Sequence, residues 1–147
     1  MGNERVSMLI KKTSLIVEKK TNAVLAPYEL TNAQFRILML LYHKREKSIR
    51  QIDIENAFAM TNPTVTGILN NLEKKGLVQR LDHPDDKRSK LILLTDAALE
   101  MIPELDSLGE IIEDQVTSVL SDEERAALAT LLNKIMRHAG ELRDAKH

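Results

Sequence analysis

The sequence contains no cysteine, so disulfide bonds, cysteine metal sites and thiol catalysis are all excluded. It also lacks a long hydrophobic run. The longest unbroken run covers residues 37–42, far short of the roughly 20 residues that a membrane-spanning helix needs. The polar start, Met-Gly-Asn-Glu-Arg, has no signal-peptide core. These absences predict a protein of the reducing cytoplasm with no membrane partner.

Sequence signatures of catalysis are missing as well. There is no glycine-rich phosphate loop, no His-Glu-x-x-His metal helix and no nucleophile with a recognisable partner. The four histidines are too scattered to form a zinc sensor. The acidic residues of segment 82–86 are adjacent in a loop, where side chains rarely converge on one ion. The sequence therefore predicts a protein that is not an enzyme and holds no metal or cofactor.

Charge is distributed unevenly along the 147 residues. Residues 1–95 contain 16 Lys and Arg against 10 Asp and Glu, whereas residues 96–147 contain 5 against 12. The net charge of +6 in the first part suits a polyanionic partner, and the acidic remainder indicates a region with another task. Chance placement of surface charges is the alternative interpretation.

Apolar residues recur at spacings of three and four over most of the chain, which predicts a mainly helical fold. The expected helices cover residues 6–25, 32–43, a short stretch from residue 49, 63–75, 96–120 and a final stretch from residue 122. Pro103 is expected to interrupt or kink the fifth of these, because proline removes a hydrogen bond inside a helix. In the short third helix, Ile52, Ile54 and Phe58 are expected to face inward.

Helix caps mark several of these starts. Capping boxes are expected at Thr31-x-x-Gln34, Ser48-x-x-Gln51 and Ser121-x-x-Glu124. Asn62 is expected to cap the fourth helix, with Pro63 as its first residue, where the missing N–H has no cost. Thr95 is expected to cap the fifth.

Two short β-compatible runs, 77–81 and 90–94, flank a charged segment and predict a hairpin. Three helices followed by a hairpin are the order of a winged helix-turn-helix. The expected fold is thus mainly α with a small β-hairpin wing, flanked by N- and C-terminal dimerisation helices. The expected regions are 1–30 for N-terminal dimerisation, 31–95 for DNA binding and 96–147 for C-terminal dimerisation, all within one compact chain.

The fourth helix is the candidate recognition element. Its apolar residues fall on one side of a helical wheel, and the opposite side is small and hydrogen-bonding, which suits the major groove. There, asparagine can pair with adenine, and threonine can meet base edges or the thymine methyl. An ordinary solvated surface is the alternative. The candidate DNA contacts of this helix are Pro63, Thr64, Thr66, Asn70 and Lys74.

The hairpin tip supplies candidate contacts of its own. Arg88, with Lys87 and Lys90 beside it, could meet a phosphate or enter a minor groove. Asp86 could orient Arg88 through an ion pair. A solvated turn with a weak surface ion pair is the alternative.

These residues resemble the MarR-type transcriptional regulators. The wing carries the pattern Leu77-Val78-x-Arg80, Asp82-x-Pro84-x-Asp86-x-Arg88 and Ile92-x-Leu94-Thr95. Upstream, the resemblance includes Leu30-Thr31, Pro63-Thr64-Val65-Thr66, Leu69 and Leu72-Glu73-Lys74-Lys75-Gly76.

The resemblance implies a homodimer that binds a pseudo-palindromic operator in double-stranded DNA, as a repressor that a small aromatic or phenolic ligand releases. It places Thr64, Thr66 and Asn70 in the major groove and Arg88 in the minor groove. Many relatives have arginine where this chain has Gly67 and Asn71, so their operator sequences cannot be transferred.

Two further sets of residues complete the hypothesis. The 3-4 spacing of apolar residues after residue 96 and on the last helix predicts a dimerisation seam, with a closed intrachain bundle as the alternative. The expected seam includes Leu105, Leu108, Ile112, Leu131 and Ile135. The candidate ligand cleft comprises Tyr28, Arg36, Tyr42 and His43. The alternative is that these residues serve ordinary packing or lie on the surface. At the level of function, the alternative is a winged-helix module that binds protein rather than specific DNA.

Overall fold

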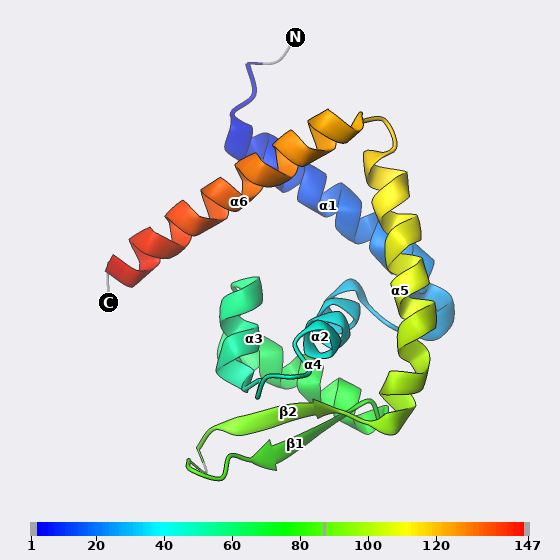
Figure 1. The fold of residues 1–147 in the computed structure, drawn as a ribbon, viewed down its shortest axis with the longest axis vertical. Helices are drawn as coiled ribbons and strands as arrows, with labels where there is room; N and C mark the ends of the chain where they lie inside the picture. The colour runs from blue at the N-terminus through cyan, green and yellow to red at the C-terminus, as the bar shows by residue number, and fades with distance from the viewer. Residues whose placement is uncertain (1–2, 87, 146–147) are drawn as a thin grey trace. The chain divides into compact units, whose positions relative to one another are not determined.

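The computed structural model describes residues 3–86 and 88–145. Helices dominate it, and one antiparallel hairpin interrupts them (Figure 1). The elements are α1 (Val6–Leu25), a 3-10 turn (Ala26–Tyr28), α2 (Asn32–His43), α3 (Gln51–Phe58), α4 (Asn62–Lys74), β1 (Val78–Asp82), β2 (Lys90–Leu94), α5 (Asp96–Thr117) and α6 (Asp122–Ala145). This order confirms the expected fold class.

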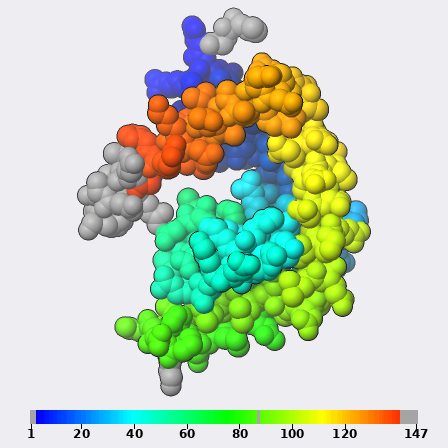
Figure 2. Space-filling model, viewed as in Figure 1, coloured from blue at the N-terminus to red at the C-terminus, as the bar shows by residue number. Residues whose placement is uncertain are grey.

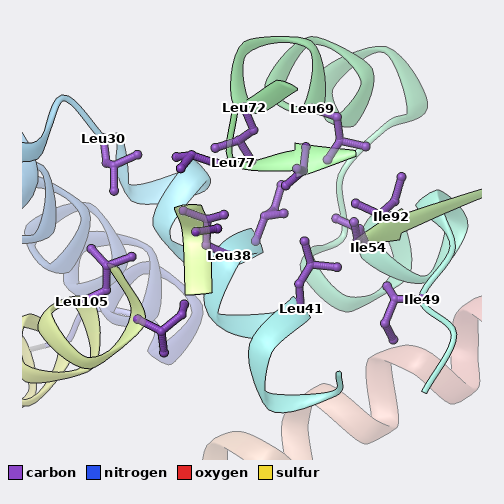
Figure 3. Packing of buried hydrophobic residues seen from close by; sticks show 14 of the residues in the cluster. Leu30, Leu38, Leu41, Ile49, Ile54, Leu69, Leu72, Leu77, Ile92 and Leu105 are labelled. Carbon is purple, nitrogen blue, oxygen red and sulfur yellow. The ribbon is translucent and has the colours of Figure 1, made fainter. Parts of the chain in front are cut away.

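The chain forms two compact units, residues 1–112 and residues 113–147. The first contains α1 to α4, the hairpin and most of α5; the second contains the end of α5 and α6. The core lies in the first unit. Figure 3 shows it as a continuous apolar cluster to which α2, α3, α4, β2 and α5 all contribute. Its fully buried large side chains include Leu25, Ile37, Leu38, Ile54, Leu69, Leu72, Ile92 and Leu105.

The hairpin is tied to the helices by a third extended segment. β1 and β2 pair in the register Val78↔Leu94 to Asp82↔Lys90. On the other edge of β2, Arg50 forms a bridge with Leu91, and the Ile92 N–H donates to the Ile49 carbonyl at 2.9 Å. A two-stranded hairpin is marginal alone, so this extra pairing and the buried Ile92 hold the wing in place.

The same pairing corrects the expected start of the third helix. Ser48 does not cap it, because residues 49–50 are extended along β2 and the helix begins at Gln51. The Asp53 carboxylate instead accepts from the Arg50 N–H at 2.8 Å. Ile52 was also predicted wrongly: it is exposed, whereas Ile54 is fully buried and Phe58 is half-buried against the core.

The remaining caps agree with the predictions, with small shifts. The box at Thr31 and Gln34 is complete, Ser121 and Glu124 exchange reciprocal bonds of 3.1 and 2.9 Å, and Thr95 accepts from the Ala98 N–H. Three expectations were wrong. Thr61, not Asn62, caps α4, which puts Pro63 at the second helical position. Helix α5 ends at Thr117 rather than Leu120, and it continues through Pro103 without interruption.

Candidate DNA-binding interface

Helix α4 is fixed in the core by one face and exposes the other. Val65, Leu69 and Leu72 are all fully buried. Because these residues lie on one side of the helix, Pro63, Thr64, Gly67, Asn70 and Lys74 are left exposed on the surface. The Thr61 hydroxyl oxygen accepts from the Thr64 N–H and so secures the start of the helix. Five outward positions of a rigid helix are thus open to a partner.

Two threonines of this face already contact the protein. The Thr61 hydroxyl donates to Thr64 Oγ1 at 2.9 Å. Thr66 is half-buried rather than fully outward, and its Oγ1 accepts from Gln51 Nε2 of α3 at 2.8 Å. Helix α3 therefore helps to orient the outward surface of α4.

Arg80 on β1 joins the wing to α4, a role that the sequence did not reveal. Its Nη2 donates to Asn70 Oδ1 at 2.5 Å and to Glu73 Oε1 at 3.0 Å. The hydrogen bond from Arg80 holds the pKa of the Glu73 carboxyl below its usual value. Through this guanidinium, a candidate DNA contact on α4 is attached to the strand that leads to the wing tip.

At the wing tip, Asp86 shapes the turn more than it orients the Arg88 side chain. Asp86 Oδ1 accepts from the Arg88 backbone N–H at 3.0 Å, whereas Arg88 Nε lies 3.5 Å away. The Arg88 side chain is 94% exposed. Lys90 forms an ion pair with Asp82 across the hairpin, and Lys87 lies outside the described residues. Figure 2 shows the green hairpin tip protruding from the body of residues 1–112.

The expected dimerisation residues divide into buried and exposed sets. Leu105 is 1% exposed and packs into the core of residues 1–112. Ile112 is also buried, and Leu108 packs partly against the core. On α6, by contrast, Leu131 is 57% and Ile135 46% exposed.

Helix α1, which lies in the region expected to dimerise, exposes apolar surface of its own. Six of its large hydrophobic side chains are exposed, namely Val6, Met8, Leu9, Ile10, Leu15 and Ile16. In the sequence, apolar residues at helical spacing form an incomplete stripe along this helix. Exposed apolar side chains thus lie along α1 and, separately, along α6.

The four candidate ligand-cleft residues have separate surroundings. The Tyr28 hydroxyl donates to Glu104 Oε1 at 2.6 Å, and Arg36 is exposed. Tyr42 and His43 meet edge to face at 5.6 Å, and the Arg45 guanidinium lies 4.1 Å from the Tyr42 ring centre. None of the four lines the cavity of about 440 Å³ between the end of α2 and α3, which is lined by Lys44, Lys47, Ser48, Ile49, Asp53, Asn56 and Ala57.

Within residues 3–86 and 88–145, no group of three or more histidine, aspartate or glutamate side chains could hold a metal ion. No helix in the described part of the chain is long and apolar enough to span a membrane.

An exposed helix after a helix-turn, followed by a hairpin with a projecting arginine, defines the winged helix-turn-helix class of DNA-binding proteins. The family model described as "MarR family" matches residues 30–90. The HTH-type transcriptional regulator PecS of Dickeya dadantii is 30% identical over 132 residues, which cover 88% of this chain and 78% of that protein. The chain therefore belongs to the MarR family and is a DNA-binding transcriptional regulator.

Two solved structures support this assignment. The Staphylococcus aureus MepR–DNA complex matches with a TM-score of 0.81 and 30% identity, over 93% of this chain and 99% of that one. A mutant MarR of Escherichia coli in complex with operator DNA matches with a TM-score of 0.78 and 27% identity, over 88% of this chain and 92% of that one.

Proposed function

We propose that this protein is a dimeric repressor that binds a pseudo-palindromic operator with α4 in the major groove and Arg88 in the minor groove. The single observation that carries the proposal is the pairing of an exposed α4 surface, uncharged and hydrogen-bonding from Pro63 to Asn70, with a projecting wing arginine, both fixed to one core. Solvated helices usually carry charged side chains at such positions. The related MepR and MarR structures contain DNA, which supports the same mode of binding.

Dimerisation follows from the apolar surfaces. Exposed leucine, isoleucine and methionine side chains line α1 and, separately, α6. A second copy of the chain would bury them and would present two recognition helices about one DNA turn apart, as a pseudo-palindrome requires. Homodimers and repression are also typical of the family. Such a regulator acts where the chromosome is, in the cytoplasm.

A small-molecule effector is part of the proposal, but its site is not assigned to one cavity. Tyr28, Arg36, Tyr42 and His43 remain candidates at the surface of residues 1–112. An effector can release DNA only if it binds better to a dimer geometry that fits the operator poorly.

The first experiment is fluorescence anisotropy of the purified protein on DNA from upstream of its own gene, compared with scrambled DNA over a salt series. Specific binding that weakens steeply with salt supports the proposal, because phosphate contacts release counterions. The rival function, a winged-helix module that binds protein, predicts equally weak binding to both DNAs. Sedimentation analysis of the same sample tests the dimer.

A further inference from the structure

The amide of Asn70 is held in one orientation by Arg80. A guanidinium has five N–H donors and no acceptor, so the Asn70 atom that faces Arg80 Nη2 at 2.5 Å must be the oxygen. Rotating the amide by half a turn would bring two donors together. The two N–H groups of Asn70 Nδ2 are therefore the part of this exposed side chain left free for a partner.

Glu73 keeps the guanidinium in place. Arg80 Nη2 and Nε lie 3.0 and 3.5 Å from the two carboxylate oxygens of Glu73, which is a forked contact. The Arg80 side chain is only 23% exposed, and Arg80 pairs with Ile92 in the β1–β2 ladder of the wing. The cation that orients Asn70 is thus itself fixed before DNA arrives.

This orientation bears on which base Asn70 can read. The usual pairing of asparagine with adenine needs the amide oxygen to accept from the N6 amino group while the amide nitrogen donates to N7. In this chain that oxygen is turned toward a cation and accepts from it, which leaves it one of its two lone pairs. The free N–H donors suit the two acceptors of guanine, O6 and N7, or O4 of thymine. At adenine they find one acceptor, N7, beside the N6 donor, and cytosine offers them only a donor.

We propose that Arg80 is a positioning residue that makes Asn70 a hydrogen-bond donor toward DNA, so that α4 selects guanine or thymine over adenine or cytosine at one base. This replaces the expectation that Asn70 pairs with adenine. The inference rests on the proposed placement of α4 in the major groove. Thr64 has a similar polarity, because its oxygen accepts from Thr61 and its own hydroxyl hydrogen is left to donate.

The test is selection of operator variants from a randomised library by the full-length wild-type protein, followed by the same selection with Asn70→Ala. The base read by Asn70 is the position whose preference disappears in that variant. We expect wild type to favour guanine or thymine there, on one strand, by about fivefold over adenine or cytosine. Selection of adenine or cytosine at this position would overturn the proposal.

Two substitutions test the positioning role itself. Arg80→Met frees the amide, so the preference at this one position should flatten or shift to adenine while preferences elsewhere persist. A merely structural role would weaken binding to all sequences equally and leave the preference intact, which would contradict the inference. Glu73→Gln is the matched control: it removes the charge, but its amide oxygen can still accept from Arg80 and hold the guanidinium beside Asn70, so the preference should be retained.

Asn70→Asp gives an independent answer if Arg80→Met does not fold. Aspartate keeps the contact with Arg80 but presents an acceptor to DNA, so the preference should invert to adenine or cytosine. A retained guanine or thymine preference would refute the proposal. If wild type selects a specific operator but no position depends on Asn70, this inference fails while the proposed function stands. If wild type selects no sequence, both fail.

Discussion

Replacing Arg88 with alanine should weaken DNA binding and leave folding almost unchanged. The Arg88 side chain is 94% exposed, and its nearest charged partner, Asp86, lies 3.5 Å from Nε. A surface ion pair of this kind contributes little, so the free energy of unfolding should change by at most about 0.5 kcal/mol. The bond from the Arg88 backbone N–H to Asp86 does not depend on the side chain, so the turn should persist.

The effect on DNA is much larger because the proposed dimer carries two wings. At about 1 kcal/mol for each lost contact, the two wings together give about 2 kcal/mol, or a roughly 30-fold loss of affinity. If each arginine neutralises one phosphate, the slope of log K against log salt should fall in magnitude by roughly 1.8. Affinity and salt dependence should therefore change together, while stability does not.

The assay is anisotropy on the specific operator between about 50 and 200 mM salt, with urea unfolding of the same samples. Arg45→Ala is the charge-matched control, because Arg45 lies beyond α2 against Tyr42 rather than on the wing or α4. It should retain both the affinity and the salt slope. Parent-like affinity and slope in Arg88→Ala would refute the proposed role of the wing.

Three further changes test the core, the dimer and one titration. Leu69→Ala should lower the free energy of unfolding by about 2–5 kcal/mol in urea melts, because Leu69 is fully buried; a smaller loss would mean that the core collapses around the gap. Leu131→Glu should fold but sediment as a monomer, since Leu131 is 57% exposed on α6; a persistent dimer would remove α6 from the interface. The hydrogen bond to Glu104 raises the pKa of Tyr28, so this bond stabilises the fold at neutral pH and its contribution is lost as pH rises through that raised value. Phenolate absorbance should therefore show a component that titrates late, and Tyr28→Phe should remove it; a late component that survives unchanged in the variant would contradict the assignment.

Helix starts could be predicted at two of the three expected capping boxes. Thr31 with Gln34 and Ser121 with Glu124 form the bonds that their spacing predicts. Such caps depend on local backbone geometry and form where no tertiary contact requires another backbone conformation. The buried and exposed faces of α4 could also be predicted, because its buried residues repeat at helical spacing.

The error at Ser48 has a tertiary cause. Its spacing to Gln51 is as favourable as that of the other boxes, yet Ile49 is buried and its carbonyl accepts from Ile92 on β2. That bond requires an extended backbone at residues 49–50, which delays the helix to Gln51. Spacings of three and four residues cannot reveal a hydrogen-bond partner that lies more than forty residues away in the sequence.

The contact of Arg80 with Asn70 and Glu73 escaped prediction for a related reason. Alternation along β1 places Arg80 on the same face as the buried Val78, but it does not show which helix lies beside it. That depends on the turn after α4, where Gly76 adopts a φ of 74° and the Leu77 N–H donates to the Leu72 carbonyl. The sequence thus identified the exposed residues of the site, and the turn determined which of them are joined.

The continuity of the core has a consequence for control by an effector. Leu25 of α1, Leu69 of α4, Ile92 of β2 and Leu105 of α5 belong to one buried cluster. Close-packed cores resist local deformation, so a force applied at α1 or at the start of α5 moves α4 and the wing together. An effector would then change the spacing of the two recognition helices in the dimer and leave the surface of α4 unaltered. The base preference set by Asn70 should accordingly be the same with and without effector, while the overall affinity falls.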